Sequence, residues 1–231
     1  MRFAFIARHR SIWPVAWLCR ALDVSLSGFH AWLNRSPSAR PRRRGLPKDI
    51  GERASVSDNL LDRAFEASAP NQKWIADFTY IWTAEGWLYV AAVIDLFSRR
   101  AVVWGMKAEM TAQFVTDALI MAIWRRGKPD SLLHHSEQGS QYTSEQFQRL
   151  MADHGITCSM SRSGNVWDNA AIESFFSSLK TERTARKVYR TRDDARADVF
   201  DYVERFYNPR RRHSTLGYMS PVEFKEQAML A

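Results

Sequence analysis

The chain has 231 residues, 45% of them hydrophobic and 13% aromatic, so it can bury a sizeable core, and wholesale disorder is excluded. The longest apolar runs, such as residues 88–94, are far shorter than the ~20 residues of a membrane span, and because charges interrupt the first residues we expect no signal peptide. The net charge of +8 arises in residues 1–50, which hold ten Lys and Arg against two Asp. A DNA-contacting arm and a basic solubilising tail both explain that excess. Two distant cysteines indicate a reduced protein, and we expect a cytoplasmic location without a membrane partner.

The N-terminal residues predict two short helices, Trp13–Leu22 and Leu26–Leu33, joined by a turn. Together they would form a small helix-turn-helix within residues 1–36. Residues 37–58 follow as a basic, proline-rich linker.

From residue 59 to residue 231 the pattern changes to alternating strands and helices. The spacing of 73–81, 87–95 and 100–106 favours three antiparallel strands. The segments that follow predict a helix at 111–125, a strand at 131–135, a helix at 144–154, a strand at 156–160, and helices at 168–183 and 193–207, the last being the final helix. The first of these helices should bury one apolar face, made of Phe114, Val115, Ala118, Leu119, Ala122 and Ile123. The helix at 168–183 should bury a stripe made of Ile172, Phe175, Phe176 and Leu179. We therefore expect an α/β domain with one mixed sheet.

Three carboxylates stand out by position. Asp77 interrupts a strand that is apolar on both faces, Glu137 follows a short buried strand, and Glu173 lies on the polar face of a helix. Each alone could be structural: a turn acid, a loop acid, or part of an exposed helix face. If they converge, they would repel one another unless divalent cations lay between them, and hard ions such as Mg²⁺ take oxygen ligands.

Basic residues provide candidate DNA contacts. Lys180 lies seven residues after Glu173, on the same helix face. Arg210, Arg211 and Arg212 form a run after the helix at 193–207, where a role on the DNA backbone competes with that of a solvated turn.

Residues 59–224 resemble, almost without a gap, the second open reading frame of the IS-three family of bacterial insertion sequences. The segments that carry the resemblance are NLLDRAFEASAPNQKWIADFTYI, EGWLYVAAVIDLFSRRAVVW, HHSEQGSQYTSEQF, GITCSMSRSGNVWDNAAIESFFSSLK and FYNPRRRHSTLGYMSPVEF. The start of the chain also looks like the family's helix-turn-helix.

The resemblance implies a retroviral-integrase-like DDE transposase with a ribonuclease-H-like, mixed five-stranded sheet flanked by helices. It implies a catalytic and metal-binding triad at Asp77, Glu137 and Glu173 that uses Mg²⁺ or Mn²⁺. It further implies cleavage of double-stranded DNA at the element's ends and strand transfer to a target. The expected partners are an upstream-frame transposase protein, separate or fused, and further copies of the chain, acting on the nucleoid.

Two features depart from the family. The family has Asp where Glu137 stands, and one added methylene moves the carboxylate by about 1.5 Å, whereas misplacements near 1 Å can cost on the order of 10²-fold in rate. In addition, relatives have a longer segment where this chain has only the linker 37–58. We therefore expect a transposase impaired by Glu137. The alternatives are a catalytically inactive DNA-binding relic and a ribonuclease-H-like nuclease for RNA–DNA hybrids.

Overall fold

The computed structural model describes residues 3, 6, 7, 10, 14–22, 24–33, 56–127, 131–163 and 165–230. The chain divides into two compact units, residues 1–52 and residues 53–231. In the first unit, helices α2 (Val15–Ala21) and α3 (Leu26–Leu33) occupy the two predicted helical segments. Their small core is centred on Ile6, Cys19 and Phe29. Most of the predicted linker 37–58 lies outside the described residues.

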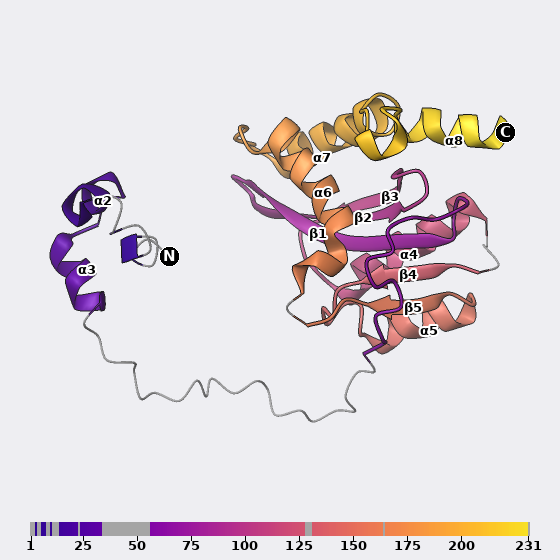
Figure 1. Ribbon diagram of the computed structural model, residues 1–231, viewed down its shortest axis with the longest axis horizontal. Coiled ribbons are helices and arrows are strands. Elements are labelled where there is room, and N and C mark those ends of the chain that lie inside the picture. The colour runs from indigo at the N-terminus through magenta and orange to yellow at the C-terminus, as the bar shows by residue number, and fades with distance from the viewer. Residues whose placement is uncertain are drawn as a thin grey trace. The chain divides into compact units, whose positions relative to one another are not determined.

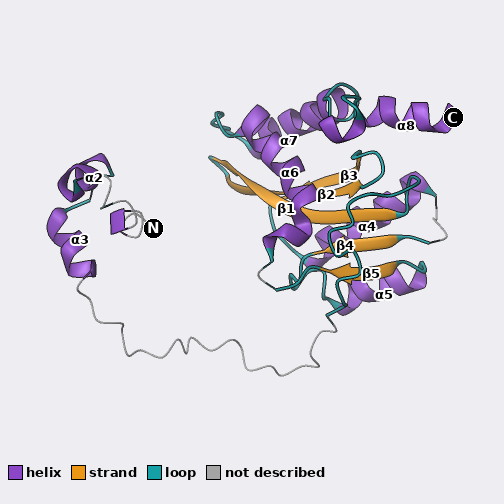
Figure 2. Ribbon diagram, in the orientation of Figure 1, coloured by secondary structure: helices purple, strands orange, loops and turns teal. Residues whose placement is uncertain are grey.

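The second unit contains one five-stranded sheet with the strand order β3-β2-β1-β4-β5 (Figures 1 and 2). The strands are β1 (Lys73–Thr83), β2 (Gly86–Asp95), β3 (Ala101–Lys107), β4 (Leu133–Ser136) and β5 (Thr157–Met160). The first three pair antiparallel, while β4 is parallel to both β1 and β5. The predicted mixed sheet and its antiparallel meander are therefore confirmed.

Helices cover both faces of the sheet because the strands are apolar on both sides. On one face lie α4 (Ala112–Arg126) and α5 (Glu145–Asp153), packed over residues such as Trp74 and Val93. On the other lie α6 (Ala170–Leu179) and α7 (Arg192–Phe200), packed over residues such as Ile75 and Ile94. The apolar face predicted for α4 is buried at every position: Phe114, Val115, Ala118, Leu119, Ala122 and Ile123.

The long helix predicted at 168–183 is built from three segments. A 3-10 turn (Val166–Asn169) precedes α6, and a π-helical turn, η2 (Lys180–Thr184), continues it. In η2 the amide of Ala185 donates to the Lys180 carbonyl at 2.7 Å, five residues back. A second π-helical segment, η3 (Asp201–Tyr207), extends α7 in the same way.

The expectation that the helix at 193–207 ends the fold is wrong, because α8 (Pro221–Leu230) follows it. Ser220 and Glu223 form reciprocal side-chain to backbone hydrogen bonds at its start, and Pro221 occupies the first helical position. Both are sequence signals of a helix N-terminus. No helix in the described part of the chain is long and apolar enough to cross a membrane.

Candidate active site

Asp77 lies in the middle of β1 on the sheet face that α6 covers. It pairs with Ala92 of β2, and its Oδ1 accepts a hydrogen bond of 2.7 Å from the Phe78 amide. Burial, together with the neighbouring carboxylates of Glu137 and Glu173, raises the pKa of Asp77 to about 7. Lys180 acts in the opposite direction. The electrostatic environment of Asp77 thus contains both of the other predicted acids.

Glu137 is brought beside Asp77 by parallel strand pairing. His135 of β4 pairs with Ile75 of β1. Glu137 lies two residues after His135 and Asp77 two residues after Ile75, so the two acids are on neighbouring chain segments at the same level. Parallel strands lie about 4.8 Å apart, and residues two positions apart in a strand point to the same face. Burial raises the pKa of the Glu137 carboxyl. The following residue anchors the loop, since Gln138 Nε2 donates to the Ser161 carbonyl at 2.8 Å.

The Glu137 side chain folds back over its own loop. Its Oε1 lies 3.0 Å from the point that a Cβ atom on Gly139 would occupy. A glycine at position 139 therefore leaves room for this orientation of the longer acid.

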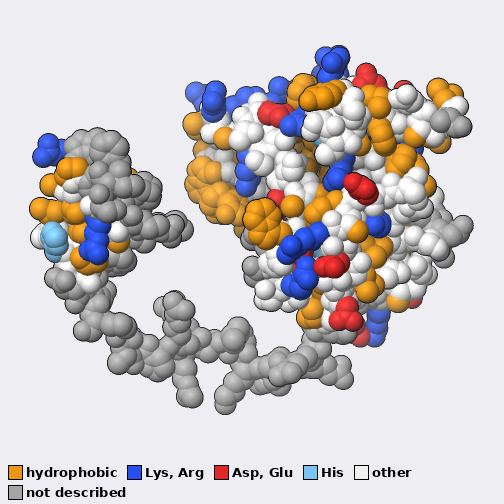
Figure 3. Space-filling model, in the orientation of Figure 1, with side chains coloured by type: hydrophobic (Ala, Val, Ile, Leu, Met, Phe, Trp, Pro, Cys, Tyr) orange, Lys and Arg blue, Asp and Glu red, His pale blue; other side chains and the backbone are white. Residues whose placement is uncertain are grey.

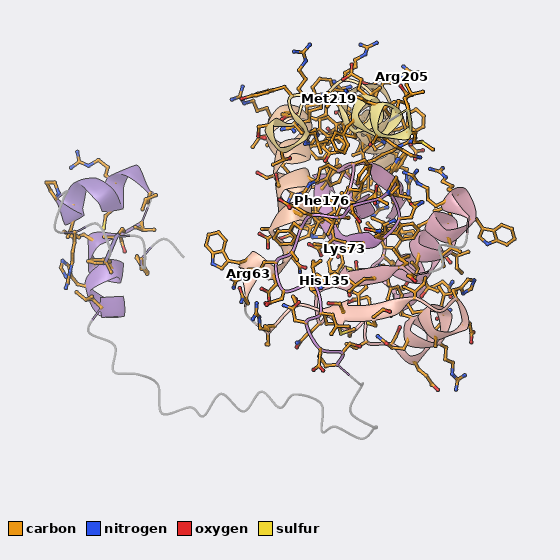
Figure 4. All side chains as sticks on the ribbon, turned by 45° about the vertical axis from the view of Figure 1, so that its right-hand side comes forward. Arg63, Lys73, His135, Phe176, Arg205 and Met219 are labelled. Carbon is orange, nitrogen blue, oxygen red and sulfur yellow. The ribbon has the colours of Figure 1, made fainter. Side chains whose placement is uncertain are left out.

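Glu173 projects from α6 between two pockets. The buried stripe of this helix is as predicted, comprising Ile172, Phe175, Phe176 (labelled in Figure 4) and Leu179. Glu173 lies on the exposed side, where it lines one pocket of about 270 Å³ with Glu137 and another of about 450 Å³ with Asp77. Ser177 and Lys180 line the second pocket too, so the predicted polar face of α6 borders Asp77.

The three acids supply the right donors for a hard divalent cation but are not gathered around one point. Within the described residues, no group of three or more His, Cys, Asp or Glu side chains is arranged to hold a metal ion. The donor chemistry nevertheless fits such an ion, because carboxylate oxygens are its preferred ligands and the neighbouring negative charges already raise the pKa of Asp77.

A buried ion cluster around Asp168 supports the start of α6, and the sequence reasoning missed it. The Asp168 carboxylate is fully buried and accepts hydrogen bonds from Arg162, Arg63 and Asn59. The Arg162 guanidinium accordingly holds the pKa of Asp168 far below its usual range. The carboxylate is enclosed by its own partners, which join the segment before β1 to the loop after β5.

His135 links the same region to β4 (Figure 4 labels His135 and Arg63). Its Nδ1 lies 2.8 Å from Ser159 Oγ, which in turn accepts hydrogen bonds from the amides of Leu60 and Leu61. Its neighbour His134 points to the opposite face, where its ring contacts Phe147 edge-on. Burial lowers the pKa of both imidazoles, to about 3 for His134 and about 4 for His135. Both rings are therefore neutral supports at pH 7.

The three arginines predicted to bind DNA have different surroundings. Arg210 and Arg212 are exposed. Arg211 instead forms a bidentate ion pair with Glu182, with nitrogen–oxygen distances of 2.8 and 2.9 Å. On the face drawn in Figure 3, Lys and Arg side chains are mixed with Asp and Glu side chains over the second unit, in line with its nearly even charge balance.

Comparisons with known proteins bear on this arrangement. Two family models described as "Integrase core domain" match residues 67–166 and 154–221. Transposase InsF for insertion sequence IS3A, from Escherichia coli K12, is 35% identical to the chain over 98% of it and 99% of the relative. The chain belongs to the IS3 family of transposases. The IS3-family alignment spans 285 positions against the 231 residues of this chain, so the relative has residues without a counterpart here.

A further relative agrees with this membership, and solved structures agree on the fold. The uncharacterized 31 kDa protein of insertion element IS600, from Shigella sonnei, is 42% identical over 74% of this transposase and 63% of that protein. A simian T-cell lymphotropic virus intasome with a PP2A regulatory subunit contains a chain with a TM-score of 0.56 at 16% identity, covering 91% of this chain and 73% of that one. The magnesium-bound, trimeric catalytic core of HTLV-2 integrase has a TM-score of 0.50 at 16% identity, and the match covers 69% of this chain and 99% of that one. The transposase thus has the integrase-type, ribonuclease-H-like fold that the sequence predicted.

Proposed function

We propose that the chain cuts double-stranded DNA at the ends of an insertion element and transfers the resulting 3′-hydroxyl ends to target DNA. The observation that supports this proposal is the placement of Asp77 and Glu137 on adjacent parallel segments. Glu173 lines one pocket with Glu137 and another with Asp77. In the first step water adds to a phosphorus atom and the bond to the 3′ oxygen breaks. In the second, the freed 3′-hydroxyl forms a new phosphodiester bond and displaces a target 3′ oxygen.

Asp77, Glu137 and Glu173 would hold Mg²⁺ or Mn²⁺ in this reaction. Bound divalent ions would supply activation of the attacking oxygen and stabilisation of the leaving oxygen. Lys180 would contact a DNA phosphate beside Asp77, because it lines the same pocket. The exposed Arg210 and Arg212 would contact the DNA backbone further along the strand.

The remaining partners follow from the same proposal. The N-terminal helices α2 and α3 would bind the element's ends, and further copies of the chain would assemble on paired ends. An upstream-frame protein, fused or separate, would add the DNA recognition that the short linker 37–58 lacks. The place of action would be the nucleoid, in the cytoplasm.

A second candidate is an inactive DNA-binding relic, which the folded-back orientation of Glu137 favours. The deciding experiment compares the parent chain with Glu137→Asp on duplexes that carry the ends of the encoding element, in Mg²⁺ and in Mn²⁺. Asp77→Asn is the inactive control. If the transposase is impaired by side-chain length, Glu137→Asp should raise cleavage and strand transfer by on the order of 10²-fold.

Two other outcomes would decide against parts of this proposal. Equal activity of the parent and Glu137→Asp would show that the length of the acid is unimportant. DNA binding without cleavage by either protein would establish the relic instead.

A further inference from the structure

Helix α6 borders a further pocket, on a different face from Glu173. This pocket has a volume of about 230 Å³ and lies between α6, the turn after β2 and the segment that follows η3. Its polar lining consists of Arg99, Ser174, Ser178, Arg211, His213 and Thr215. We propose that it binds a phosphate group of the DNA backbone, an inference that rests on the proposed action on DNA.

Arg99 supplies the positive charge of this phosphate pocket. Its side chain is half-buried, and Nη2 donates to the Phe65 carbonyl at 3.1 Å. Among the described residues it forms no direct ion pair: the carboxylates of Glu66 and Asp95 act on it only at longer range, and burial lowers the pKa of its guanidinium. A half-buried charge without a directly bound carboxylate is costly, and a bound anion offsets that cost.

The backbone at Arg99 adds to the evidence that its position is specified. Its φ of +59° lies in the left-handed region, which few residues other than glycine adopt. Tyr207 fixes this conformation, because its hydroxyl donates to the Arg99 carbonyl at 3.1 Å.

His213 contributes an unused polar atom. Its Nε2 is buried and has no hydrogen-bond partner among the described residues. Burial together with the nearby Arg211 and Arg99 lowers the pKa of His213 to about 4, so the ring is neutral at pH 7 and carries a single N–H. With that N–H on Nε2, an anion oxygen in the pocket would be its acceptor.

Hydroxyl groups complete the lining. Those of Ser174, Ser178 and Thr215 make no hydrogen bond to any described residue, so each can donate to a phosphate oxygen. Arg211 is already engaged by Glu182 and acts as a wall of the pocket.

The surroundings point to DNA as the source of the phosphate. Arg210 and Arg212, both exposed, lie on the chain segment that forms one side of the pocket. The pocket and the candidate active site occupy two faces of α6, so one helix would contact DNA at both places.

A matched pair of substitutions tests the proposal in the full chain. Thr215→Glu places a negative charge on the pocket lining, whereas Ser214→Glu places the same charge on the adjacent exposed residue, outside it. Ser174→Asp, on the exposed part of α6, repeats the test from the opposite wall. Inorganic phosphate, titrated into ¹⁵N-labelled protein, should shift the amide signals of residues 174 and 213–215 in the parent and in Ser214→Glu. Thr215→Glu and Ser174→Asp should lose these shifts.

Duplex DNA then distinguishes backbone phosphate from free phosphate. In EDTA, where no cleavage occurs, Thr215→Glu should bind DNA about 10-fold more weakly than Ser214→Glu. The slope of its log affinity against log salt concentration should be shallower by the amount expected for about one phosphate contact. Absence of phosphate-induced shifts in the parent would overturn the pocket as an anion site. Phosphate-induced shifts with equal DNA affinities for the two glutamate variants would overturn DNA as its ligand. Both measurements are independent of cleavage, so failure of strand transfer leaves the result interpretable.

Discussion

Glu137 lies against Gly139, with its Oε1 3.0 Å from the position that a Cβ atom on that glycine would take. The carboxylate is the flexible end of a side chain, so added bulk at position 139 would move it without disturbing the backbone. This contact makes the orientation of the middle acid of the proposed triad adjustable from a neighbouring residue.

Gly139→Ala should tighten Mn²⁺ binding, because the added methyl group disfavours the folded-back rotamer. Rotamer preferences of about 0.5–1.5 kcal/mol correspond to roughly 2- to 10-fold in affinity. Isothermal titration calorimetry measures the effect. In a Glu137→Asp background the shorter acid does not reach the methyl group, and the same alanine should change nothing. An equal effect in both backgrounds would contradict the rotamer explanation.

The raised pKa of Asp77 predicts how stability depends on pH without divalent ions. The folded protein holds the Asp77 proton up to about pH 7, whereas the unfolded chain releases it near 3.8. The proton on Asp77 therefore stabilises the fold fully below pH 3.8, and this stabilisation declines as the pH rises and is lost above pH 7. The free energy of unfolding should fall by on the order of 2–4 kcal/mol in total over this range. Asp77→Asn should remove this decline in the free energy of unfolding, measured in urea from pH 4 to pH 8. Added Mg²⁺ should stabilise the parent at pH 8 and leave Asp77→Asn nearly unchanged.

Asp168→Asn should destabilise the fold by about 1–3 kcal/mol, because Arg162 and Arg63 lose a shared carboxylate and a buried site then faces unmatched donors. Because the pKa of Asp168 is lower in the folded protein than in the unfolded chain, its carboxylate stabilises the fold at pH values above the unfolded pKa. That stabilisation is lost as the pH falls through the folded pKa. Asp62→Asn is the control, since Asp62 pairs with the same Arg162 but is 70% exposed. Its cost should stay within about 1 kcal/mol. Equal losses in the two variants would show that the burial of Asp168 is unimportant.

Lys180→Gln should weaken DNA binding and reduce its salt dependence by about one phosphate contact. The Lys180 ammonium group also lowers the pKa of Asp77, so its removal should move the decline of stability to higher pH. Arg186→Gln removes the same charge from an exposed residue. If fluorescence anisotropy shows both variants binding DNA alike, Lys180 has no specific contact.

Periodic features were predictable from the sequence, whereas features that depend on distant contacts were not. The strand around Asp77 and the apolar faces of α4 and α6 follow from local spacing, and all were predicted. The Asp168 cluster depends on Asn59 and Arg63, more than 100 residues earlier in the chain, so no local pattern reveals it. The missed helix α8 is different, since its capping residues Ser220 and Glu223 were visible.

The candidate site shows the same division. Local pattern indicated the positions of Asp77 and Glu137 in the chain, whereas their neighbouring placement comes from the parallel pairing of β1 with β4, which no local pattern specified. The orientation of the Glu137 carboxylate depends on rotamer choice above Gly139, and the pairing of Arg211 depends on Glu182, 29 residues earlier. Neither the Glu137 orientation nor the Arg211–Glu182 pair follows from the spacing of residues in the sequence.

The π-helical turn η2 has a consequence for how the transposase can vary. One additional residue in the turn rotates everything beyond Lys180 by roughly 100° relative to α6. Glu173 and Lys180 line the pocket that contains Asp77, whereas Glu182, within the turn, pairs with Arg211 and Tyr202. Residues after the turn can change to suit the C-terminal segment without altering the direction in which Glu173 points. Deleting a single residue there would rotate those later side chains out of phase and leave the face of α6 that carries Glu173 intact.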